Sequence, residues 1–219
     1  IVLEIWLRGL LFGHNTRRAM RIRRRWARNL LPTVGIRVET HGDIPDYPCL
    51  IVGNHRSYLD PIVLLRDVDA YPVAKAELAD WPIIGKGARM AGILYLQRES
   101  AASRGEILRL MGRRIEAGFQ VIIFPEGTTS GLPGTLPFRK GGFQLAARSG
   151  IPVVPVALCF ADPADYWVGH ESFGGHAARR FGEKRIDLTL FYGPPMQHED
   201  AEVLMAEARA WIEERLKGG

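Results

Sequence analysis

Apolar residues along most of this chain fall in short runs typical of β-strands, and helical patterns separate several of these runs. The expected strands cover residues 36–40, 49–53, 120–124, 153–159 and 186–191. Apolar residues at helical spacing predict helices over 61–68, 104–117 and 143–149, and a closing amphipathic helix over 201–217. Because strands alternate with helices, the pattern predicts a single α/β domain with a largely parallel sheet flanked by helices.

A helix with two unlike faces is expected between His14 and Leu31. Arginines and apolar residues both recur there at steps of three and four: Arg17, Arg21, Arg24 and Arg28 on one stripe, and Ala19, Ile22, Trp26 and Leu30 on the other. Pro32 is expected to end the helix. An arginine face beside an apolar face with a tryptophan is typical of a helix that lies among lipid headgroups.

The positive charge of the chain is concentrated in this segment. Residues 1–31 carry a net charge of +7, whereas residues 32–219 carry −2. A basic arm favours a polyanionic partner, and we expect 1–31 to be a basic amphipathic segment that docks on a membrane. Two alternatives are that this helix packs on its own domain with solvated arginines, or that it binds nucleic acid. The negative charge of 32–219 and the lack of a known recognition motif count against nucleic acid.

Neither a membrane-spanning helix nor a disulfide is expected. The best apolar candidate, 1–12, is interrupted by Glu4 and Arg8, and a spanning helix needs about 18 or more apolar residues. Cys49 and Cys159 each lie in an apolar run, which favours two buried thiols.

A histidine and an aspartate follow the apolar run 49–53. Asn54 and His55 come at the carboxyl end of this expected strand, where open α/β sheets bind ligands, and Asp60 is five residues after His55. Residues five apart on a helix point about 140° apart, so the two side chains can meet only across a turn. Pro61 favours Asp60 as the N-cap of a helix with His55 outside it. Asp60 would then orient the imidazole as a base; the alternative is that Asp60 only caps the helix.

A second polar cluster, 124–130, follows the expected strand 120–124. Its glycine, threonines and serine make a turn whose backbone N–H groups and hydroxyls can bind an oxyanion or a polyol. A tight structural turn is the alternative, but Glu126 has no evident structural task there.

Basic residues lie near both clusters. Arg98 follows an apolar run, and Arg139 and Lys140 precede a helix, so each can bring positive charge to a phosphate; solvated loop charges are the alternative. The other histidines lack metal-ligand spacing, so no metal site is expected. The chain has no GxSxG, GxxxxGK[ST] or strand-linked GxGxxG motif, which counts against α/β-hydrolases, nucleoside triphosphatases and dinucleotide enzymes.

Taken in order, four blocks resemble those of the phospholipid and glycerol acyltransferases, the family whose best-known members acylate 1-acyl-sn-glycerol-3-phosphate. Residues 54–60 resemble its NHxxxxD block and 92–98 its second block, which ends in an arginine. Residues 124–130 resemble its FPEG block and 151–155 its proline-containing fourth block. Order and spacing agree over about 32–195, so the resemblance implies that 32–219 is an acyltransferase domain.

The resemblance implies an O-acyltransferase that needs no cofactor or metal. His55 would be the general base, Asp60 would fix its imidazole, and the acceptor hydroxyl would attack an acyl thioester supplied by acyl-CoA or acyl carrier protein. No covalent acyl-enzyme is implied. The residues expected to bind the acceptor are Asn54, Glu126, Gly127 and Thr128, with Arg98 and Lys140 facing its phosphate.

One position departs from the family pattern and leaves the acceptor open. The commonest third block has an arginine after Gly-Thr, where it helps to hold phosphate, and this chain has Thr129. We place a 1-acyl-sn-glycerol-3-phosphate acceptor first, which would give phosphatidic acid, and another lysolipid such as lyso-ornithine lipid second. A thioesterase or lipid hydrolase is the alternative enzyme. An insoluble acceptor agrees with the basic helix, and we expect a peripheral or monotopic protein on the cytoplasmic face of the cell membrane.

Overall fold

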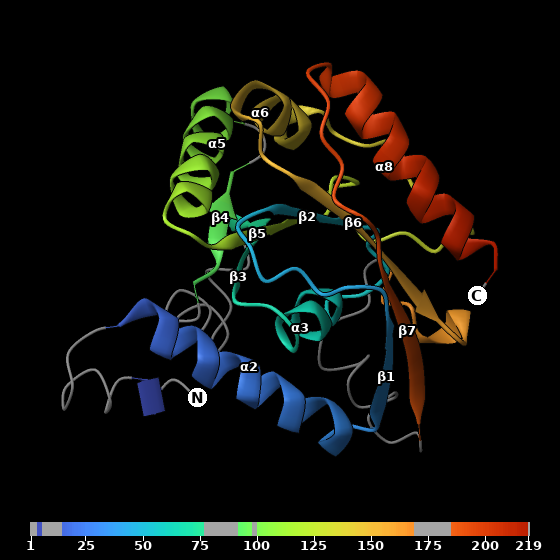
Figure 1. Ribbon diagram of the computed structural model, residues 1–219. Coiled ribbons are helices and arrows are strands. Elements are labelled where there is room, and N and C mark those ends of the chain that lie inside the picture. The colour runs from blue at the N-terminus through green and yellow to red at the C-terminus, as the bar shows by residue number, and fades with distance from the viewer. Residues whose placement is uncertain (1–3, 6–14, 77–91, 98–99, 169–184, 219) are drawn as a thin grey trace.

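A seven-stranded sheet with helices on both faces forms the centre of the molecule (Figure 1). The structure is a computed structural model that describes residues 4–5, 15–76, 92–97, 100–168 and 185–218. The strands lie in the order β1-β7-β6-β2-β5-β3-β4. They are β1 (Ile36–His41), β2 (Leu50–Gly53), β3 (Ala70–Lys75), β4 (Leu94–Leu96), β5 (Gln120–Ile123), β6 (Val153–Phe160) and β7 (Ile186–Tyr192).

Five neighbouring strands of this sheet are parallel. They are β6, β2, β5, β3 and β4, whereas β7 runs antiparallel to β6, and β1 pairs parallel with β7. The predicted α/β fold with a largely parallel sheet is therefore confirmed. The parallel strands end together at one edge, and the residues that follow β2 and β5 meet there.

Five α-helices in the described part of the chain cover the two faces (Figure 1). On one side lie α5 (Ala101–Glu116), α6 (Gly141–Ser149) and α8 (Ala201–Leu216); on the other lie α2 (Thr16–Thr33) and α3 (Asp60–Leu65). Side chains cap three of them, because Asn15, Ser100 and Asp200 each accept a backbone N–H of the first turn.

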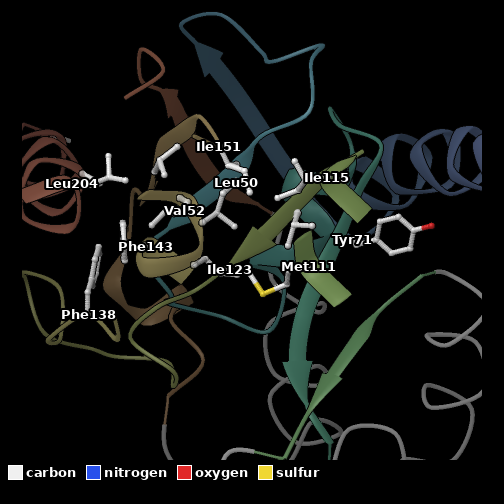
Figure 2. Packing of buried hydrophobic residues seen from close by; sticks show 14 of the residues in the cluster. Leu50, Val52, Tyr71, Met111, Ile115, Ile123, Phe138, Phe143, Ile151 and Leu204 are labelled. Carbon is white, nitrogen blue, oxygen red and sulfur yellow. The ribbon is translucent and has the colours of Figure 1, made fainter. Parts of the chain in front are cut away.

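The central strands are buried on both faces, which explains their continuous apolar runs. Successive strand side chains point to opposite faces, so Leu50 and Val52 join one core and Ile51 joins the other. Figure 2 shows the first core, where the sheet packs against α5, α6 and α8. Cys49 and Cys159 are buried free thiols, as expected, and burial raises the pKa of Cys49 to about 12.

Two strands and one helix end differ from the prediction. β3 contains Pro72 and ends at Lys75, and β4 has only three residues, so neither gives a clear apolar run. Pro32 does not end α2, which continues to Thr33. A proline in the last turn removes only one backbone donor, and the N–H groups of Val34 and Gly35 still bond to Leu30 and Pro32.

The helix α2 packs on the domain through one face. Met20, Ala27 and Leu31 are buried on this face. Ile22, which the stripe pattern placed toward lipid, is also buried, although it points about 160° away from Met20 on the helix. Arg23 is buried as well; its Nη2 donates to the backbone oxygen of Ala70 at 2.6 Å. Burial lowers the pKa of Arg23 to about 10. The packing alternative therefore holds for this face.

The other face of α2 is exposed. Arg17, Arg21, Arg25 and Arg28 form one exposed stripe, and Nη2 of Arg25 donates to Oε1 of Glu4. Trp26, whose side chain is 37% exposed, lies about 100° or more around the helix from these arginines. Arg28 also donates from Nε to the backbone oxygen of Arg66. No helix within the described ranges combines the length and the apolar character needed to cross a membrane.

Candidate active site

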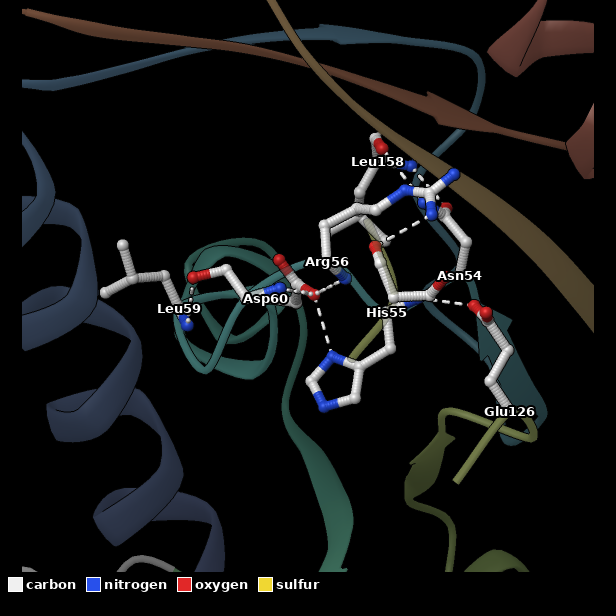
Figure 3. A network of polar contacts seen from close by, with 9 residues as sticks. Asn54, His55, Arg56, Leu59, Asp60, Glu126 and Leu158 are labelled. Atoms are coloured by element: carbon white, nitrogen blue, oxygen red, sulfur yellow. Dashed lines mark hydrogen bonds and ion pairs between the residues drawn. The ribbon is translucent and has the colours of Figure 1, made fainter. Parts of the chain in front are cut away.

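His55 and Asp60 are in direct contact just beyond the carboxyl end of β2 (Figure 3). Nδ1 of His55 lies 2.8 Å from Oδ2 of Asp60. The side chain of His55 is 14% exposed, and that of Asp60 is fully buried. Among the described residues, Nε2 of His55 has no hydrogen-bond partner, so one imidazole nitrogen is held by the carboxylate and the other is left for a substrate.

The sequence suggested Asp60 as the N-cap of α3, and this prediction is wrong. The helix begins at Asp60 itself with Leu59 as the cap residue. Oδ2 of Asp60 instead accepts the backbone N–H groups of Arg56 at 2.7 Å and Ser57 at 2.8 Å. The carboxylate thus points back into the turn after His55. One oxygen therefore orients both this turn and the imidazole.

Aromatic rings fix the imidazole from a second direction. Phe124, the residue after β5, stacks on His55 with ring centroids 4.4 Å apart and an interplanar angle of 19°. Tyr58 lies edge-on at 6.4 Å and packs in turn against Trp167. The ring of His55 is therefore held between a carboxylate and an aromatic face, a preorganised base.

Glu126 links the two polar clusters. Its Oε1 accepts the backbone N–H of His55, and its Oε2 accepts that of Leu136, both at 2.8 Å. Burial raises the pKa of Glu126, and these two hydrogen bonds oppose the shift. Glu126 therefore has a structural task that the sequence did not reveal. Its contact with an acceptor stays a prediction.

Asn54 also holds the main chain beside His55. Its Nδ2 donates to the backbone oxygen of Leu158, and its Oδ1 accepts the N–H of the same residue. The side chain is fully buried. This pair of bonds continues the pairing of β2 with β6 past the end of the strand. The geometry supports a positioning role for Asn54, and contact with a substrate stays a prediction.

The loop after β5 turns sharply at Gly127. Gly127 has φ +79°, in the left-handed region that favours glycine, and its N–H donates to the backbone oxygen of Phe124. Thr128 is exposed, and the N–H of Ser130 donates to the backbone oxygen of His55 at 2.9 Å. The two clusters predicted separately therefore form one site.

Arg56 is a residue that the sequence reasoning missed. Its guanidinium is buried and donates to the backbone oxygens of Ser130, Pro133 and Gly134. It thereby fastens the 130–134 segment to the turn that carries His55. The only signal in the sequence was its place inside the NHxxxxD block, where a buried charge was not foreseen.

Of the two cations expected near a phosphate, Lys140 is the one that lies within the described residues. Lys140 extends toward α8, where Nζ lies 3.7 Å from Oε1 of Glu202. Arg98 lies outside the described residues. Within the described ranges there is no group of three or more side chains placed to hold a metal ion.

A histidine oriented by an aspartate at the open edge of a parallel sheet is an arrangement suited to proton transfer in a group-transfer or hydrolysis reaction. Comparison with known proteins identifies the family. Residues 35–159 match the family described as Acyltransferase. This span is more than half of the chain, and the chain belongs to that family.

Two curated relatives and one solved structure illustrate the likeness. A chloroplastic 1-acyl-sn-glycerol-3-phosphate acyltransferase of Brassica napus is 32% identical over 172 residues, 78% of this chain and 47% of that protein. A lyso-ornithine lipid O-acyltransferase of Rhizobium meliloti (strain 1021) is 35% identical over 141 residues, 64% of this chain and 48% of that protein. The chain thus spans about half the length of these relatives.

The solved structure supports the fold. It is a 1-acyl-sn-glycerophosphate acyltransferase of Thermotoga maritima, with a TM-score of 0.73 and 21% sequence identity. The match covers 98% of this chain and 86% of that one.

Proposed function

We propose that this protein is an O-acyltransferase that moves a fatty acyl group from a thioester to a hydroxyl of a lysolipid. The observation that carries the proposal is the His55 and Asp60 pair, with Nδ1 held at 2.8 Å and Nε2 facing away from the carboxylate. Family membership supports acyl transfer as the reaction. The donor is acyl-CoA or acyl carrier protein, and the reaction uses no cofactor.

The proposed chemistry is a single displacement at the thioester carbonyl. Nε2 of His55 accepts the proton of the acceptor hydroxyl while the hydroxyl oxygen attacks the carbonyl carbon of the thioester. The C–O ester bond forms, the C–S bond breaks, and the proton passes from the imidazolium to the leaving thiolate. Asp60 stabilises the imidazolium through Nδ1. The backbone N–H of Thr128, in the loop after Gly127, is the candidate to bind the developing oxyanion.

The acceptor placed first is 1-acyl-sn-glycerol-3-phosphate, which gives phosphatidic acid. Relatives bearing this name in Brassica napus and Neisseria meningitidis support it. Thr129 and two relatives named lyso-ornithine lipid O-acyltransferase support lyso-ornithine lipid as the second candidate. Glu126, Gly127 and Thr128 would hold the headgroup side of either acceptor, with Arg98 and Lys140 as candidate cations.

We also propose that the enzyme works on a membrane surface, with α2 as part of its docking face. Outside its packed face, α2 exposes Arg17 and Arg21 on one stripe and Trp26 on another. Arginines attract anionic headgroups and an exposed tryptophan enters the interface. In this proposal 1–31 is the docking segment and 32–219 the catalytic domain, on the cytoplasmic side.

The test is product analysis with the purified protein. It is incubated with acyl-CoA or acyl carrier protein and either 1-acyl-sn-glycerol-3-phosphate or lyso-ornithine lipid, and lipids are identified by mass spectrometry. A diacylated product with either acceptor supports acyl transfer and names the acceptor. Release of free fatty acid at the same rate with and without acceptor would show a thioesterase and overturn the proposal.

A further inference from the structure

The side chain of Arg139 lies directly against Gly127 of the loop that follows β5. A Cβ placed on Gly127 would be 2.8 Å from Nε and 3.4 Å from Cζ of Arg139. These distances place the guanidinium end of Arg139 against the backbone of Gly127. The backbone N–H of Arg139 also donates to the backbone oxygen of Pro125 at 3.0 Å, which fixes the base of the side chain beside the same loop.

The charge of Arg139 is available to a ligand. Three other basic residues are engaged: Arg56 with three backbone oxygens, Lys140 with Glu202, and Arg209 with Glu213. The guanidinium of Arg139 takes part in no hydrogen bond or ion pair with the described residues, and its side chain is exposed. It is thus a solvent-accessible cation held against a loop of the candidate site.

Gly127 belongs to the loop that contacts His55, so Arg139 lies beside the loop that holds the proposed base. Gly127 follows Glu126, whose Oε1 accepts the N–H of His55. A phosphate bound at Arg139 would therefore lie at the same loop that positions the base. A guanidinium suits a phosphate because its planar N–H groups can bond two oxygens at once.

We propose that Arg139 binds the phosphate of the lysolipid acceptor and thereby selects a phosphate-bearing headgroup. This inference rests on the proposed acyltransferase function and assigns its acceptor class. Arg139 supplies, from ten residues further along the chain, the positive charge that Thr129 does not carry.

The test measures steady-state kinetics of Arg139→Ala and Arg139→Lys with 1-acyl-sn-glycerol-3-phosphate and acyl-CoA. Arg148→Ala is the matched control, because it removes an exposed arginine from the far end of α6. Arg139→Ala should raise the acceptor KM by about tenfold or more and change kcat by less than about threefold, as expected for loss of a charge-assisted bond made in the ground state. Arg139→Lys should recover part of this loss, and Arg148→Ala should leave the KM unchanged.

Glycerol 3-phosphate and glycerol serve as competing probes. Glycerol 3-phosphate should inhibit the wild type more strongly than Arg139→Ala, whereas glycerol should not distinguish them. An unchanged acceptor KM in Arg139→Ala would overturn the proposal. So would a rise confined to the KM of acyl-CoA, which would place Arg139 at a donor phosphate.

The activity of the wild type with the two acceptors distinguishes a failure of this inference from a failure of the proposed function. If it acylates lyso-ornithine lipid but not the phosphate lysolipid, acyl transfer stands and the role of Arg139 is refuted. If it acylates neither, the proposed function itself fails and the inference falls with it.

Discussion

Two buried carboxylates contact His55, and they hold different parts of it. Asp60 binds the imidazole Nδ1 through Oδ2, whereas Glu126 accepts the backbone N–H through Oε1. The side chain is thus oriented by one acid and the main chain by the other. Residue spacing predicted the first contact, because HxxxxD brings the two side chains together across a turn. It did not predict the second, because 71 residues separate Glu126 from His55.

The buried position of Glu126 predicts a dependence of stability on pH. Burial raises its pKa above the ordinary value of 4.5, so the folded state binds this proton more tightly than the unfolded chain. The contribution of Glu126 to stability is then full below pH 4.5 and falls as pH rises through the raised pKa. Because Glu126→Gln cannot ionise, the difference in free energy of unfolding, wild type minus variant, should fall over this range.

Urea unfolding followed by tryptophan fluorescence at a series of pH values measures this difference. Glu199→Gln, which removes an exposed carboxylate, is the control and should show no such fall. A difference that is constant with pH, or that rises with pH, would contradict the shift.

At the scale of elements, the sequence predicted best where burial is complete. The runs 49–53, 120–124 and 153–159 are apolar throughout because β2, β5 and β6 are covered on both faces. β3 and β4 lie toward one end of the sheet and are less uniformly buried, so their residues carry no such signal. The contacts of Arg56 could not be predicted either, because they join segments about 75 residues apart.

Gly193 lies where β6 and α8 pack closely, and this packing leaves no room for a side chain. At Gly193 a Cβ would lie 2.7 Å from Cγ of Pro155 and 2.9 Å from Cε2 of Trp211, and neither ring can move aside easily. Gly193→Ala should therefore lower the free energy of unfolding by roughly 1–3 kcal/mol.

Gly105 is the comparison for Gly193, because the same change to alanine there should have the opposite effect on stability. It lies inside α5, and a Cβ there would meet nothing within 4 Å. Gly105→Ala should raise the free energy of unfolding by about 0.5–1 kcal/mol, because alanine loses less backbone entropy in a helix. Thermal and urea denaturation of both variants measure the two signs, and equal effects would refute the packing argument.

At the scale of the whole molecule, α2 combines packing with an exposed basic face. The stripe pattern predicted a helix with unlike faces but could not tell which face would meet the domain. Arg23 is the instructive residue, since its sequence context matches that of the exposed arginines and yet its side chain is buried against Ala70. Only tertiary contacts distinguish it.

Membrane docking through α2 predicts a specific loss of binding. Trp26→Ala should weaken binding to vesicles that contain anionic lipid by roughly threefold to tenfold, because one exposed ring leaves the interface. Tyr47→Ala is the control, since its side chain is equally exposed, at 37%, but lies on another part of the molecule. Vesicle sedimentation at low and high salt measures the binding.

High salt should reduce the binding of both wild type and variant without abolishing that of the wild type, which keeps an apolar component. Equal binding of Trp26→Ala and wild type would show that α2 does not dock through this face. Loss of all binding at high salt would instead favour a purely electrostatic partner such as nucleic acid.

In the proposed reaction His55, oriented by Asp60, is the base for acyl transfer. The most direct measurement is the turnover of His55→Ala with acyl-CoA and the acceptor that the wild type uses, with His41→Ala as the control on an exposed histidine. Circular dichroism and thermal denaturation establish that the variants are folded. His55→Ala should lower kcat by about 10²–10⁴, the usual contribution of a positioned general base, while His41→Ala stays at the wild-type rate. Turnover of folded His55→Ala at the wild-type rate would contradict the account.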